Sequence, residues 1–229
     1  MIIGGFQKVS LIDYPGKICA IVFTQGCNFR CPFCYNLNLV LPELFKEPIL
    51  EKDILSFLDK RKGKLDAVEI TGGEPTIQEG LLDFMKKIKE KGFLIKLDTN
   101  GTNPDVLKTA IKGKLVDYLA MDIKAPWDKY FQVAGVDVEI KKIQESIKII
   151  KESGIDYEFR TTVIPGMHTK EDIIKIAQEI KPAKKYCLQN FQQKKTINPK
   201  FESLQPYSKE FLEEIVKEIK EGFEICQVR

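Results

Sequence analysis

Three cysteines lie close together near the start of the sequence. Cys27, Cys31 and Cys34 are spaced C-x3-C-x2-C, directly after an apolar stretch that ends in Gly26. Three thiolates cannot all pair as disulfides, and iron–sulfur clusters are held by cysteines at comparably short spacings. Three ligands leave one iron of a 4Fe–4S cluster open, and an open metal position is where substrate chemistry takes place. The alternatives are a structural zinc site with a distant fourth ligand and three unrelated buried cysteines. The single histidine, His168, is far from the triplet in sequence.

The residues around this triplet resemble an enzyme family. C-x3-C-x-(aromatic)-C, with Phe33 as the aromatic residue, is similar to the signature of radical S-adenosylmethionine (radical SAM) enzymes. Further motifs are similar to those of the enzymes that activate glycyl radical enzymes: SLIDYPG at 10–16, GGEP at 72–75, DTNG at 98–101 and DIK at 122–124. The branch that the chain most resembles is the activating protein of anaerobic ribonucleoside-triphosphate reductase.

This resemblance implies two cofactors, a 4Fe–4S cluster on the three cysteines and S-adenosylmethionine (SAM) on the open iron. The positions that it implies for SAM or cluster contacts are Phe33, Tyr35, Gly73, Glu74, Asp122, Lys124 and Gln192. Gly73 and Glu74 would meet the methionyl amino group of SAM, and Lys124 its carboxylate. Matching positions also suggest a monovalent cation, with Asp98, Thr99 and Asp122 as its ligands.

Each of these assignments has a simpler structural alternative. Gly73 suits an ordinary strand-to-helix turn, Phe33 and Tyr35 suit loop packing, and the acidic and basic pair at 122 and 124 suits a solvated ion pair. Gln192 stands where pyruvate formate-lyase activators carry a histidine. That difference argues against pyruvate formate-lyase as the target and leaves the adenosyl contact open.

The implied function is cleavage of SAM by one electron, followed by removal of a glycine Cα hydrogen in a partner enzyme. Anaerobic ribonucleotide reductase is the expected partner, and a flavodoxin- or ferredoxin-like protein the expected electron donor. One alternative is a radical SAM enzyme that acts on a small molecule, such as a deazaguanine synthase. Another is an iron–sulfur or zinc protein without catalysis, although such a protein has no use for the GGEP motif.

The composition describes a globular protein of 229 residues with 43% hydrophobic and 30% charged residues. A net charge of +3 is too small to predict binding to nucleic acid, and no stretch is long and apolar enough to cross a membrane. Six cysteines without a secretory signal predict a reducing, cytoplasmic location. The three outside the triplet, Cys19, Cys187 and Cys226, are predicted to be small buried residues.

Strands and helices alternate along the sequence. Strands are predicted over 18–24, 67–71, 93–97, 118–123, 157–164 and 186–188, with helices between them. A capping box at Thr76 and Glu79 predicts one helix start, and Thr169 and Asp172 predict another. Alternation of this kind predicts a parallel sheet, and the family resemblance favours a partial (β/α)6 barrel.

Every motif follows a predicted strand or ends it. In parallel α/β folds the loops at the carboxyl ends of the strands form one rim, where ligands bind. The motifs are therefore expected to form a single site. One domain over residues 1–229 is predicted, with an N-terminal segment at 1–16. The irregular residues 190–207 are expected either to dock the partner's glycine loop or to form a solvated surface loop, and His168 is expected at the surface.

Overall fold

The computed structural model describes residues 1–229, which pack as two compact α/β units. The first unit contains residues 1–28, 36–99 and 103–119, and the second contains residues 29–35, 100–102 and 120–229. The boundary falls inside the cysteine triplet, so that Cys27 belongs to the first unit and Cys31 and Cys34 to the second. The expectation of one domain stays a prediction. No helix is both long and apolar enough to cross a membrane.

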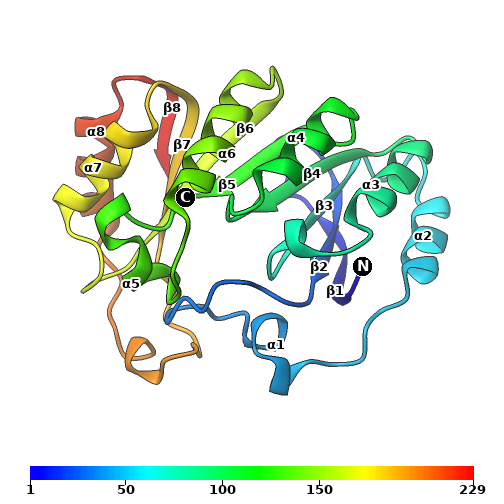
Figure 1. Ribbon diagram of the computed structural model, residues 1–229, viewed down its shortest axis with the longest axis horizontal. Coiled ribbons are helices and arrows are strands. Elements are labelled where there is room, and N and C mark those ends of the chain that lie inside the picture. Colours follow the sequence, from blue (N-terminus) through cyan, green and yellow to red (C-terminus); the bar gives the residue numbers. More distant parts are fainter. The chain divides into compact units, whose positions relative to one another are not determined.

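The first unit is built on four neighbouring strands in chain order: β1 (Ile3–Ser10), β2 (Cys19–Thr24), β3 (Ala67–Gly72) and β4 (Leu94–Thr99). β1 is antiparallel to β2, whereas β2, β3 and β4 are parallel. β2 is buried almost throughout, as its apolar sequence predicts. The helices α2 (Glu51–Asp59) and α3 (Leu81–Glu90) pack side by side (Figure 1), and the short α1 (Leu37–Val40) and α4 (Pro104–Lys112) complete the unit.

The capping box predicted at Thr76 and Glu79 is wrong. Residues Pro75–Ile77 form a 3-10 turn, and α3 begins only at Leu81, after Gly80 in the left-handed conformation at φ +78°. The Thr76 hydroxyl donates a hydrogen bond to Glu74 Oε1 at 2.6 Å. It is therefore engaged with the GGEP motif and does not cap the helix.

The second unit carries the parallel strands β6 (Asp156–Val163), β7 (Ala183–Asn190) and β8 (Phe223–Val228). Its helices are α5 (Tyr130–Ala134), α6 (Ile140–Glu152), α7 (Lys170–Ile180) and α8 (Lys209–Ile219). The helix start predicted at Thr169 and Asp172 is confirmed, and these two residues form a capping box that opens α7. The helices α7 and α8 lie side by side, with α8 against β7 and β8 (Figure 1). β5 (Tyr118–Asp122) is divided between the units after Leu119.

Candidate active site

The cysteine loop of the second unit, residues 29–35, is fastened to the segment that follows β7. The backbone N–H of Ile197 donates to Cys34 O at 3.0 Å, and that of Asn198 donates to Pro32 O at 2.8 Å. Thr196 is 2% exposed. In Figure 1 the orange segment after β7 runs to this blue part of the chain. Residues 196–198 therefore form one wall of the cysteine loop, and the alternative of a solvated surface loop is wrong for them.

The end of α5 supports the same loop from another direction. Arg30 N–H donates to Ala134 O at 2.9 Å. Gly135 follows in the left-handed conformation, at φ +71°, and a Cβ added to it would lie 2.2 Å from Arg30 O. Only glycine allows this approach, because both the backbone conformation and the available space exclude a side chain. The residue next to Cys31 thus rests directly on the backbone of Gly135.

Asp122 and Lys124 form an ion pair, together with an arginine that sequence reasoning missed. Lys124 Nζ lies 2.9 Å from Asp122 Oδ2, and Arg160 Nε donates to Asp122 Oδ1 at 2.9 Å. Burial raises the pKa of Asp122, but Arg160 and Lys124 lower it by more, so the net pKa is below its ordinary range. Burial lowers the pKa of Lys124, but Asp122 raises it by more, so the net pKa is above its ordinary value. Both side chains are therefore charged at neutral pH.

Asp122 and Lys124 lie close enough to the cysteine loop to shift the pKa values of its residues. Burial raises the pKa of the Cys31 thiol to about 11, and Lys124 acts in the opposite direction. Partial desolvation of the hydroxyl group raises the pKa of Tyr35, and Asp122 and Cys34 raise it further. The second unit thus brings together five predicted site residues: Cys31, Cys34, Tyr35, Asp122 and Lys124. The Lys124 ammonium, whose side chain is 17% exposed, is the charge that opposes the effect of burial on the Cys31 pKa.

His168 is buried at 1% exposure, so the expectation of a surface histidine is wrong. Its Nδ1 accepts a hydrogen bond from Ile164 N–H at 3.1 Å, so its Nε2 donates to Lys124 O, 2.8 Å away. Burial lowers the pKa of His168, which favours this neutral form. Tyr207 Oη donates to His168 O at 2.8 Å. The imidazole therefore braces the backbone of Lys124 and links it to the segment after β7.

The first unit holds the GGEP motif against the chain that leads to Cys27. Glu74 N–H donates to Gly26 O at 2.8 Å. A Cβ on Gly73 would lie 2.0 Å from Gly26 O, and one on Gly72 would lie 2.4 Å from Thr24 N. Both glycines are thus required by contacts within the chain, independently of any ligand.

The Glu74 carboxylate is held rigidly. Its Oε1 accepts hydrogen bonds from Thr76 N–H at 3.0 Å, Thr76 Oγ1 at 2.6 Å and Thr99 Oγ1 at 2.7 Å. Glu74 is only 1% exposed. A carboxylate that accepts several hydrogen bonds is fixed in position as well as in charge. The contact of Gly73 and Glu74 with SAM stays a prediction.

The residues predicted to bind a monovalent cation are engaged by other side chains. Asp98 Oδ1 accepts from Lys96 Nζ at 2.6 Å, and its Oδ2 from Thr71 Oγ1 at 3.3 Å. The Thr99 hydroxyl donates to Glu74, and both oxygens of Asp122 are paired as described. The contacts of these residues do not fit a bound cation.

The remaining predicted residues differ in their surroundings. Phe33 is buried, whereas Tyr35 is 47% exposed, with Lys194 Nζ 4.9 Å from its ring centroid. Gln192 is exposed to solvent, and its contact with the adenosyl group stays a prediction.

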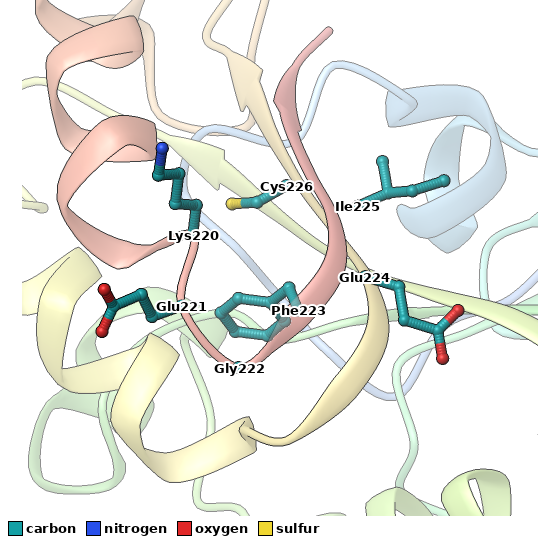
Figure 2. Close-up of a pocket in the computed structure, with 7 residues that line it drawn as sticks. All are labelled: Lys220, Glu221, Gly222, Phe223, Glu224, Ile225 and Cys226. Carbon is teal, nitrogen blue, oxygen red and sulfur yellow. The ribbon is translucent and has the colours of Figure 1, made fainter.

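The other three cysteines lie in strands, outside the C-x3-C-x2-C motif. Cys19 and Cys187 are buried as predicted, and Cys226 is half-buried on β8. Burial raises the pKa of Cys19 to about 11 and that of Cys226 to about 12. Figure 2 shows Cys226 in a hollow lined by residues 220–226, with Phe223 on the same side of the ribbon and Ile225 on the other. None of the predicted cofactor residues lines this hollow.

Comparison with known proteins identifies the family. The model of the radical SAM superfamily matches residues 21–180, which include the whole cysteine triplet. The chain belongs to the radical SAM superfamily. A putative glycyl-radical enzyme activating enzyme of Methanocaldococcus jannaschii is 38% identical over 214 residues, covering 91% of this chain and 87% of that protein. A pyruvate formate-lyase-activating enzyme of Clostridium pasteurianum is 31% identical, covering 78% of this chain and 76% of that enzyme.

Two solved structures share the fold of this chain. Streptococcus suis SuiB bound to S-adenosylmethionine superposes with a TM-score of 0.71 at 16% identity, over 90% of this chain and 49% of that protein. A second structure, anSMEcpe with bound AdoMet, gives a TM-score of 0.62 over 89% of this chain and 61% of that protein, at 16% identity. This chain spans about half of the SuiB chain. The likeness shows an α/β fold with a mostly parallel open sheet.

The donor set fits the cofactors that this superfamily implies, a 4Fe–4S cluster and SAM. The C-x3-C-x2-C spacing supplies three thiols, one fewer than the four iron atoms of a cubane cluster. In the second unit Lys124 provides a fixed positive charge near Cys31. The sequence analysis missed three supporting features: Gly135, Arg160 and the backbone of residues 196–198. Gly135 carried a weak signal as a glycine after a short helix.

Proposed function

We propose that this radical SAM protein activates a glycyl radical enzyme. The observation that carries the proposal is the 38% identity, over nearly the whole of both chains, to a protein named as a putative activating enzyme of this kind. The relative named as a probable GTP 3',8-cyclase, from Thermococcus kodakarensis, is 28% identical over 52% of its own length. The similarity therefore favours activation of a protein over chemistry on a small molecule.

The residues of this chain have positioning roles in the proposed reaction. When bound, the cluster and SAM would together supply the one-electron chemistry that removes a hydrogen atom from the partner. Cys27, Cys31 and Cys34 hold the cluster. Lys124 would bind the SAM carboxylate as a point charge, and Glu74 would meet the amino group. No side chain has to transfer a proton, which agrees with a neutral His168 that is engaged with backbone on both ring nitrogens.

The partner proposed is anaerobic ribonucleoside-triphosphate reductase, with a flavodoxin- or ferredoxin-like protein as electron donor. The SLIDYPG segment and the DIK motif support this choice of partner by resemblance. In this segment Leu11 is 70% and Ile12 is 83% exposed. Two adjacent exposed apolar side chains suit contact with another protein. The segment after β7, which walls the cysteine loop through residues 196–198, is proposed to take part in docking the glycine loop.

The function is tested by electron spin resonance. The protein is reconstituted with iron and sulfide without oxygen, then incubated with SAM, a reductant and the candidate reductase. A glycyl radical signal is expected on the reductase, and none on a reductase variant whose radical-bearing glycine is replaced by alanine. Pyruvate formate-lyase serves as the second candidate partner. If SAM is cleaved to 5′-deoxyadenosine while neither partner gains a radical, the small-molecule alternative is favoured.

Replacing Lys124 by methionine is expected to weaken SAM binding by tenfold or more. A charge-assisted hydrogen bond contributes about 1.5–3 kcal/mol, and each 1.4 kcal/mol is about tenfold in affinity. The iron content should not change, because no thiol is altered. Equilibrium dialysis against SAM measures the effect. Lys175→Met is the matched control, since it removes an ammonium paired with Asp128 at 2.7 Å on the exposed surface. Equal affinity in both variants would assign Lys124 to the ion pair alone.

A further inference from the structure

Lys96 lies between two carboxylates in the interior of the first unit. In the parallel register of β3 and β4, Glu69 stands beside Lys96. Residues two apart on a strand share a face, so Lys96 and Asp98 point the same way. Lys96 Nζ is 2.6 Å from Glu69 Oε1 and 2.6 Å from Asp98 Oδ1. Lys96 is 1% and Glu69 is 3% exposed. The ammonium is therefore enclosed by oxygen ligands and almost free of solvent.

The surroundings of this ammonium resemble those of a bound alkali cation. Hard cations take oxygen ligands, among them carboxylates, backbone carbonyls and water. Glu69 Oε2 is buried without a hydrogen-bond partner, while burial and the neighbouring Asp98 carboxylate raise the pKa of Glu69 to about 8. Lysine is almost never fully buried unless it is paired. Its presence on β4 therefore reflects a need for positive charge at this place.

We propose that the ammonium of Lys96 takes the place of a metal cation at Asp98 and that this protein needs no monovalent metal ion to fold or to bind SAM. In the second unit the side chains of Arg160 and Lys124 form ion pairs with the Asp122 carboxylate. Each carboxylate that the sequence predicted as a cation ligand thus has a positive charge from its own unit. The part concerning SAM rests on the proposed function, whereas the part concerning folding does not.

The unmodified protein gives the first test. Its melting temperature and its SAM affinity are measured anaerobically, with the cluster reconstituted, in potassium, sodium or tetramethylammonium chloride at equal ionic strength. Both quantities are expected to be the same in the three salts, with less than a twofold change in affinity. Tenfold tighter SAM binding in potassium, or a higher melting temperature there, would overturn the proposal. If the protein binds no SAM at all, the proposed function fails, and the melting temperatures still decide the part concerning folding.

The second test removes the positive charge of Lys96. Lys96→Met keeps most of the apolar stem but leaves Glu69 and Asp98 without their ammonium. This variant is expected to melt at a lower temperature than the unmodified protein in tetramethylammonium chloride. It should gain about 3 °C or more in potassium or sodium chloride. Glu69→Gln/Lys96→Met is the matched control and should respond less, because one carboxylate is gone. No response of Lys96→Met to any cation would contradict the proposal. If this variant cannot be purified, the comparison of salts with the unmodified protein decides it.

Discussion

Replacing Cys31 by alanine is expected to leave the protein without its 4Fe–4S cluster. The variant retains only Cys27 and Cys34 of the C-x3-C-x2-C motif, which is one thiol fewer than the unmodified protein offers. Iron and sulfide per chain, together with visible absorption, are measured after anaerobic reconstitution. We expect a nearly complete loss of both, because thiolates are the protein ligands of such clusters.

The matched control replaces the three cysteines outside the motif. Cys19, Cys187 and Cys226 are free thiols in strands, and changing all three to alanine should leave the iron content unchanged. Thiol pKa does not separate the two groups, since burial raises that of Cys31 as well as those of Cys19 and Cys226. The assignment therefore depends on position in the chain. Loss of iron in the triple variant would contradict it, and zinc in place of iron would favour the structural alternative.

Features of the fold that depend on the pattern of side chains are predicted well from the sequence. β2 is recognised because a continuous apolar, β-branched run suits a strand buried on both faces. The helix start at Thr169 is recognised because its hydroxyl and the Asp172 carboxylate satisfy backbone donors reciprocally. The pairing of Asp122 with Lys124 follows from a spacing of two residues, and their side chains do meet. The contribution of Arg160 could not be predicted, because it comes from β6, which is distant in the sequence.

Contacts made by backbone groups leave no comparable signal in the amino-acid sequence. Residues 196–198 reach the cysteine loop through main-chain N–H groups, which every residue except proline possesses. This segment lacks periodicity, so the sequence left its role open between docking and a solvated loop. The capping box at Thr76 failed for a related reason. Its pattern was present, but the hydroxyl is used by Glu74 in a turn whose geometry follows Pro75.

Replacing Gly135 by alanine is expected to reduce cluster occupancy sharply, although no ligand is changed. The added Cβ would lie 2.2 Å from Arg30 O and 2.7 Å from Arg30 C, so the chain beside Cys31 must move. The left-handed backbone conformation, at φ +71°, costs a residue with a side chain a further ~1–2 kcal/mol of folding free energy. Iron per chain and the rate of cluster loss in air are measured after reconstitution.

Gly154→Ala separates the two effects of this change. Gly154 has almost the same φ, +73°, but a Cβ there would meet nothing within 4 Å. Both variants should therefore lose melting temperature through backbone strain, by roughly 2–4 °C for each kcal/mol in a chain of this size. Only Gly135→Ala should also lose iron, because only Gly135 supports the backbone beside a cluster ligand. Equal iron content in the two variants would show that α5 contributes stability alone. Loss of iron confined to Gly135→Ala would make the end of α5 part of the cluster site.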